Sequence, residues 1–211
     1  MILDLFPLPS VLFPRSTMPL HIFEPRYLQM IGDCLETETP FGVILLKSGR
    51  AEGLDPVEIH RVGATAHIVS AQYKDNGTID INVLGHERFE VLKIVESSPR
   101  MIAEVRGVNW TDPDNPEIEE LAKPVTSRFA EYLKLIMALT GQWTRKLDLP
   151  TSPVMLAEYV SAGLQVDNST RQQLLEQTSV VEAMKMEMEV LDREIAKLAA
   201  AVRRAQSGRS N

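Results

Sequence analysis

The chain has 211 residues, of which 44% are hydrophobic and 24% charged, values typical of an ordinary globular protein rather than a disordered one. Twenty-nine acidic residues against 22 basic ones give a net charge of −7, which argues against a nucleic-acid partner, because nonspecific nucleic-acid binding depends on phosphate neutralisation. The single cysteine, Cys34, excludes an intramolecular disulfide, and no apolar run is long enough to predict a membrane span. With no signal-peptide pattern at the N-terminus, these features predict a cytoplasmic protein.

The chain opens with apolar residues interrupted by prolines, at residues 6–14 (FPLPSVLFP) and 18–27 (MPLHIFEPRY). Because proline has no N–H to donate to a ladder, this pattern predicts an edge strand, a tight turn and a return of the chain, ending at a helix start. The helix is predicted over residues 24–36, with a proline in its first turn. Its apolar residues at helical spacing are Tyr27, Leu28, Ile31 and Leu35.

Clusters of β-branched residues separated by turn residues predict six strands in the first half of the chain. They lie at about residues 2–6, 41–47, 61–73, 78–83, 88–95 and 101–109. The strongest local signal is the Asn76-Gly77 pair, which predicts a hairpin with a type I′ turn. One helix packed on six strands with short loops indicates a closed or nearly closed small β-barrel.

The second half of the chain is predicted to be helical. Residues 111–116 (TDPDNP) are typical of a loop, and the helical period dominates after them. The predicted helices cover about residues 117–140, 152–163, 169–177 and 179–205. The sequence therefore predicts an α+β protein with two parts, a β-barrel subdomain at 1–110 and an α-helical subdomain with a long C-terminal helix at 111–211.

The last predicted helix carries an apolar stripe with alternating spacings of three and four residues, typical of a heptad repeat. The stripe consists of Val181, Met184, Met188, Leu191, Ile195, Leu198 and Val202. Such a stripe has to be buried, either against the other helices of this chain or against a partner, as in a homodimer. Methionine is well suited to an adaptable partner surface, so both alternatives stay open at this point.

The motifs of the common catalytic and metal sites are missing. The sequence has no Gly-Lys dipeptide, which excludes a Walker A phosphate-binding loop, and no serine with glycines at both −2 and +2, as a nucleophile elbow requires. No two histidines stand two to four residues apart, and one cysteine cannot form a thiolate cluster, so neither a structural zinc nor any other cofactor is expected. Cys34 is interpreted as a buried, inert thiol.

Five stretches of this chain, taken in order, resemble the N-terminal domain of the Lon proteases. They are the opening segment, residues 41–46 (FGVILL), 62–68 (VGATAHI), 85–91 (GHERFEV) and the helical residues 152–175. The resemblance implies a PUA-like pseudo-β-barrel with one packed helix, followed by an α-helical bundle that ends in a long C-terminal helix. It also implies a role in recognising protein substrates. The chain departs from the family pattern at Arg15, where a glycine often follows Phe-Pro, which puts the conformation of that turn in doubt.

Two polar groups are candidate peptide-binding sites. The first consists of Glu24, Arg26 and Tyr27, where Arg26 either bridges strand and helix through a paired carboxylate or contacts a peptide. The second consists of His86, Glu87 and Arg88, expected at a bend between two strands, where they have either a structural role or line a cleft between barrel and bundle.

These observations favour a free-standing, non-enzymatic module that binds unfolded or peptide segments of proteins and lacks the ATPase and the Ser-Lys protease domains of Lon. A second hypothesis is an oligomerisation or adaptor protein that acts through the heptad helix, as a homodimer or with a separate protease or chaperone. A PUA-like RNA binder is a third hypothesis, by fold analogy alone, and the acidic charge disfavours it.

Overall fold

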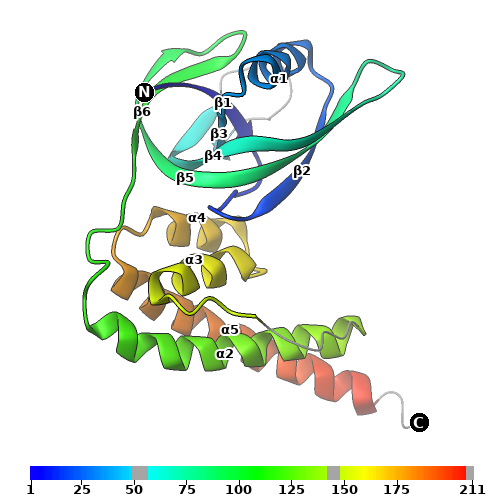
Figure 1. Cartoon of the computed structure of the whole chain (residues 1–211). Helices are drawn as coiled ribbons and strands as arrows, with labels where there is room; N and C mark the ends of the chain where they lie inside the picture. The colour runs from blue at the N-terminus through cyan, green and yellow to red at the C-terminus, as the bar shows by residue number, and fades with distance from the viewer. Residues whose placement is uncertain (49–56, 142–147, 208–211) are drawn as a thin grey trace. The chain divides into compact units, whose positions relative to one another are not determined.

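The computed structural model describes residues 1–48, 57–141 and 148–207, and over these residues the predicted α+β fold is confirmed (Figure 1). The first part contains β1 (Ile2–Leu8), β2 (Thr17–Ile22), α1 (Pro25–Thr37), β3 (Phe41–Ser48), β4 (Glu58–Tyr73), β5 (Ile79–Glu96) and β6 (Met101–Gly107). The helices that follow are α2 (Glu117–Thr140), α3 (Pro153–Gly163), α4 (Asn168–Glu176) and α5 (Val180–Ser207). All five helices begin and end within two residues of their predicted positions.

The six strands form one sheet that closes into a ring. Their order is β2-β5-β4-β3-β1-β6, and a further pairing between β5 and β6 closes the circle. The long strand β5 makes closure possible, because its first half pairs with β2 and its second half with β6. Along the first half Ile79, Ile81 and Val83 are buried, which is the period-two pattern expected of a half-buried strand.

Two features of the sheet differ from the prediction. Residues 17–22, expected only as the return of the edge segment, form the regular strand β2 despite Pro19. The predicted strands at 78–83 and 88–95 are one continuous strand, so His86, Glu87 and Arg88 do not lie at a bend between strands. Gly85 lies within this strand, and its missing side chain permits a close backbone contact.

That contact joins β5 to the turn at residues 13–16. The N–H of Arg15 donates to the carbonyl oxygen of Gly85 over 2.7 Å, and the N–H of Gly85 donates to the carbonyl oxygen of Ser16 over 2.9 Å. A Cβ atom on Gly85 would lie 2.1 Å from the carbonyl oxygen of Phe13, so no larger residue fits without a backbone shift. Arg15 adopts a left-handed conformation with φ of 62°, which explains why glycine suits this position.

The predicted hairpin between β4 and β5 is present, but its turn is not type I′. Only Gly77 has a positive φ, of 82°, whereas a type I′ turn needs two such residues. The N–H of Gly77 donates to the carbonyl oxygen of Lys74, and the N–H of Lys74 donates to that of Thr78. This is a longer hairpin loop, in which the last residue of a four-residue turn, Gly77, is left-handed.

Helix α1 covers part of the ring and closes its main core (Figure 1). Its buried residues Tyr27, Met30, Ile31 and Cys34 share one face and pack with side chains from the strands, including Phe41. A second, smaller apolar cluster centres on Phe89. Since each fully buried large apolar side chain contributes about 1.5 to 3 kcal/mol, these two clusters are the main source of stability of the barrel.

The described chain separates into two compact units, and the division does not follow the sequence strictly. The first unit contains Met1–Asn109 together with Leu164–Glu176, and the second contains Trp110–Gly163 and Gln177–Asn211. Helix α4, which was assigned to the subdomain at 111–211, therefore belongs to the compact unit of the barrel. The buried Gln172 on α4 donates from its amide to the carbonyl oxygen of Val62 in β4. As a division into domains, 1–110 and 111–211 stays a prediction.

The second unit is built on α2 and α5, which run parallel. Lys185 near the start of α5 lies 3.0 Å from Glu117 at the start of α2. Further along both helices, Arg128 of α2 lies 3.0 Å from Asp192 of α5, as expected if the two helices run in the same direction. The heptad stripe of α5 is at least half-buried throughout its length, and α5 packs against α2 and α3 of this same chain. Val181, Met184, Leu191 and Ile195 are buried, whereas Met188, Leu198 and Val202 are partly exposed.

A carboxylic acid lies inside this helical unit. Glu187 on α5 has no exposed surface, and the hydroxyl of Ser161 on α3 donates to its Oε1 over 2.6 Å. No hydrogen-bond partner reaches its Oε2 among the described residues. Burial raises the pKa of Glu187 well above its ordinary value, although hydrogen bonding by Ser161 lowers it. Burial therefore favours the neutral acid, and Oε2 is the oxygen placed to carry the proton.

Candidate functional site

Glu24, Arg26 and Tyr27 lie at the start of α1, where they hold one another in place. The guanidinium of Arg26 donates to Glu24 Oε2 over 3.1 Å and lies 4.4 Å from the centre of the Tyr27 ring. It also donates to the carbonyl oxygen of Pro99 over 3.4 Å. The Tyr27 ring is buried and packs on Phe6, with 4.1 Å between ring centres. This geometry matches the structural alternative for Arg26, and Tyr27 presents almost no surface to a ligand.

His86, Glu87 and Arg88 lie in the middle of β5 and point into different surroundings. Arg88 is buried and donates to the carbonyl oxygen of Leu175, just before the end of α4. Its N-terminal neighbours are exposed, and His86 Nδ1 lies 3.8 Å from Glu87 Oε1. The His86 ring also meets the ring of His67 on β4 edge to face, with 5.3 Å between their centres. Of this group, His86 and Glu87 are accessible to a ligand.

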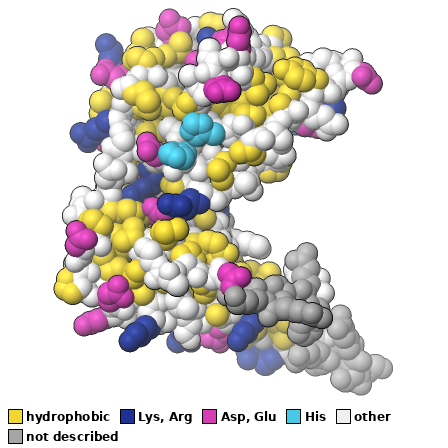
Figure 2. Space-filling view, in the orientation of Figure 1, with side chains coloured by type: hydrophobic (Ala, Val, Ile, Leu, Met, Phe, Trp, Pro, Cys, Tyr) yellow, Lys and Arg dark blue, Asp and Glu magenta, His cyan; other side chains and the backbone are white. Residues whose placement is uncertain are grey.

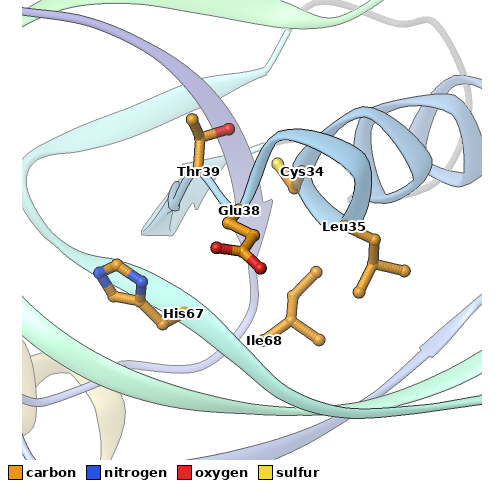
Figure 3. Close-up of a pocket in the computed structure, with 6 residues that line it drawn as sticks. All are labelled: Cys34, Leu35, Glu38, Thr39, His67 and Ile68. Carbon is orange, nitrogen blue, oxygen red and sulfur yellow. The ribbon is translucent and has the colours of Figure 1, made fainter.

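A pocket of about 430 Å³ opens beside His67, between β4 and the end of α1 (Figure 3). It is lined by Cys34, Leu35, Glu38, Thr39, His67 and Ile68. The side chain of Glu38 points into the space between His67 and the apolar pair Leu35 and Ile68 (Figure 3). The pocket thus offers an apolar surface, a carboxylate and an imidazole to one occupant.

The pocket has a negative electrostatic character. The carbonyl end of α1, which carries the negative end of the helix dipole, forms one wall, and the last turn contains no basic residue. Glu38, directly after the helix, adds a carboxylate to the pocket lining. Cys34 lies at the buried side of the pocket, where burial and the charge of Asp4 raise its thiol pKa, outweighing the hydrogen bond from Thr39. The thiol is therefore protonated at neutral pH and is a poor nucleophile.

None of the six residues that line the pocket was predicted as a binding residue. Glu38 directly follows α1, which ends at Thr37, one residue beyond the predicted helix end, at a position where glycine or asparagine is usual. Glu38 indeed has φ of 55°, and its N–H donates to the carbonyl oxygen of Cys34. The sequence did not predict that His67 and Ile68 of β4 would lie beside the end of α1, because this contact depends on how α1 packs across the sheet.

The described residues contain no group of three or more His, Cys, Asp or Glu side chains placed to hold a metal ion. Within the same residues no helix is both long and apolar enough to cross a bilayer. On the face drawn in Figure 2, acidic and basic side chains are interspersed, and that face carries no broad basic field. The candidate binding surface is therefore the pocket together with the exposed strands beside it.

Comparison with protein families places this arrangement among known proteins. Residues 2–193 match the model of the ATP-dependent protease La (LON) substrate-binding domain. The chain belongs to this family. The Lon substrate-binding fold is also found in the crystal structure of a Lon N-terminal domain protein from Xanthomonas campestris, which is 24% identical, with a TM-score of 0.63 over 88% of this chain and 95% of that one. The N-terminal domain of the Mycobacterium avium complex Lon protease gives the same TM-score at 17% identity, over 91% of this chain and 98% of that one.

Curated relatives extend the comparison to full-length proteins. The Lon protease of Anaeromyxobacter dehalogenans is 28% identical over 202 residues, and Lon protease 2 of Myxococcus xanthus is 27% identical over 202 residues. Each match covers 94% of this chain but only 24% of the relative. This Lon substrate-binding chain thus spans about a quarter of the length of these proteins, and its 211 residues include neither their ATPase nor their protease part.

Proposed function

We propose that this chain binds unfolded or extended segments of protein substrates and does not itself hydrolyse them. Membership of a substrate-binding family over residues 2–193 supports the first half of the proposal. The second half rests on the match being confined to the N-terminal quarter of Lon relatives. The observation that carries the proposal is the pocket between α1 and β4, whose apolar and acidic lining suits a side chain of a bound polypeptide.

The proposed contacts follow from exposure. Leu35 and Ile68 offer apolar surface and Glu38 and His67 offer polar groups, all lining one cavity. His86, whose ring meets that of His67, extends this surface along β5. Tyr27 and Arg88, also predicted as peptide contacts, are buried and are assigned instead to holding α1 and α4 in place.

A titration tests this proposal. Fluorescein-labelled α-lactalbumin, reduced and carboxymethylated so that it stays unfolded, is mixed with increasing protein and followed by fluorescence anisotropy. We expect saturable binding that is weakened about two- to fivefold by Glu38→Gln, the size of effect typical of an exposed charge pair. The control is Glu36→Gln, the same change two residues away and outside the pocket lining, which should leave the affinity unchanged. Absence of saturation at tens of micromolar protein contradicts the proposal.

A second candidate function uses α5 as an interaction surface. The observation that favours it is the partial exposure of Met188, Leu198 and Val202 in the otherwise buried stripe. In this proposal the chain forms a homodimer or docks on a separate protease or chaperone through the far end of α5. Sedimentation velocity separates the alternatives: an intact protein that is dimeric, and becomes monomeric with Leu198→Glu and Val202→Glu combined, supports the adaptor role. A monomer at all concentrations argues against the homodimer.

A further inference from the structure

The second half of β4 pairs with another strand on one side only. Residues 67–73 pair with β5, from His67 opposite Leu84 to Tyr73 opposite Ile79. On the other side, the pairing of β3 with β4 ends at Phe41 opposite Ala66, because the chain before Phe41 turns back into α1. Among the described strands, none lies along this side of residues 67–73. Alternate residues there direct their N–H and C=O groups away from β5, and no strand of the described residues pairs with them.

Nothing in this segment protects the open edge. Folded proteins usually block such edges with prolines or charged side chains. Strand β2, which pairs only with β5, carries Pro19 at its centre. Residues 67–73 (HIVSAQY) contain no proline, lysine, arginine, aspartate or glutamate. Residues 69–73 are exposed, including Val69 at 55% and Tyr73 at 69% of their surface.

The open edge of β4 and the pocket share residues. His67 and Ile68 belong to the start of the edge and also line the cavity, opposite Leu35 and Glu38 from the end of α1 (Figure 3). A strand lying along residues 69–73 would therefore occupy the place that β3 leaves at Phe41, and one of its side chains would reach the pocket. The Glu38 carboxylate and the carbonyl end of α1 complement a positive charge on that side chain.

We propose that an extended polypeptide segment binds by adding a strand to the edge of β4 at residues 67–73, with a lysine or arginine side chain placed in the pocket beside Glu38. The inference rests on the proposed function and assigns its binding surface. Backbone hydrogen bonds along an edge are independent of sequence, and a pocket beside the edge adds a preference for one side chain. This combination fits a protein that binds many polypeptides and still favours those with a basic residue among apolar ones.

Backbone methylation of a peptide ligand tests the strand addition. The probe is a fluorescein-labelled nonapeptide of alternating valine and threonine with a central arginine. Two further versions carry N-methyl groups on alternate residues, one set on each edge of the extended chain, leaving all side chains in place. We expect one methylated version to bind like the unmodified peptide and the other to bind at least about tenfold more weakly, because only one edge faces β4. Equal affinity of the two methylated versions overturns the proposal.

Hydrogen exchange locates the site on the intact protein. The unmodified peptide is expected to slow amide exchange in residues 67–73 and to leave β2 unchanged. Glu38→Gln should weaken binding of the arginine peptide about two- to fivefold but not that of a version with norleucine at the centre, and Glu36→Gln should affect neither.

The outcomes separate this inference from the proposed function. Protection elsewhere in the chain, with unfolded α-lactalbumin still bound, overturns the edge site and leaves the proposed function standing. Failure of both the peptide and unfolded α-lactalbumin to bind removes the proposed function itself. If the free protein sediments as a dimer whose residues 67–73 are already protected, a second copy of the chain occupies the edge, and that result also overturns the inference.

Discussion

Glu187 should make the stability of the helical unit decrease as pH rises. Its pKa is raised by burial, so the folded protein holds a proton that the unfolded chain releases above its ordinary pKa of 4.5. Between that value and the raised folded pKa, the free energy of unfolding falls with increasing pH by up to about 1.4 kcal/mol per unit. Below pH 4.5 both states are protonated and the group contributes no pH dependence.

The substitution Glu187→Gln removes the ionisation and keeps the shape of the side chain. We expect the variant and the wild type to differ little in stability near pH 4.5, and the variant to become progressively more stable by comparison as pH rises. Glu189→Gln, an exposed position on the same helix, is the matched control and should show no such trend.

Urea unfolding at a series of pH values, followed by tryptophan fluorescence, measures the effect. Trp110 belongs to the compact unit that contains Glu187, so its signal reports on that unit. A difference between Glu187→Gln and the wild type that stays constant from pH 4.5 to 8 would refute the reasoning. So would a wild type that gains stability over the variant as pH rises.

Three further predictions follow from the barrel unit. Gly85→Ala brings a methyl group against the Phe13 carbonyl oxygen and should cost about 2 kcal/mol or more in thermal or urea unfolding, whereas Gly107→Ala, with no atom within 4 Å of the added group, should be close to neutral. Gly32→Ala, inside α1 and equally unobstructed, should raise stability by about 0.5 to 1 kcal/mol, and a loss of stability would contradict the open space assigned there. Cys34, buried and with a raised pKa, should react with a thiol reagent such as DTNB at pH 7.5 at least about tenfold more slowly than in 6 M urea, and equal rates would show that the thiol is accessible.

The fold followed from the sequence wherever the signal was local. The helical periods placed all five helices, and β-branched clusters placed most strands, because each of these patterns reports on its own segment. The errors arose at contacts between distant segments. The bend predicted between residues 83 and 88 is absent, because Gly85 instead admits the turn at residues 13–16, a segment about 70 residues away in the sequence. The same limit explains α4, whose packing on β4 through Gln172 is not encoded in its own period.

The candidate site was less predictable than the fold. Polar residues in apolar surroundings drew attention to Glu24, Arg26 and Tyr27, but Arg26 donates to Glu24 and Tyr27 is buried, so these residues expose little to a ligand. The pocket is assembled from Glu38 after a helix and His67 on a strand, two residues with no shared sequence pattern. The predicted residue His86 does contact the pocket lining, because its ring meets that of His67.

The central claim is that this Lon-family chain binds polypeptide that is not folded. The most direct test titrates the intact protein against labelled α-lactalbumin in two states, the reduced and carboxymethylated unfolded chain and the native disulfide-bonded protein, under identical conditions. The account predicts saturable binding of the unfolded state and none of the native state in the same concentration range. Equal binding of both states, or of neither, would contradict it.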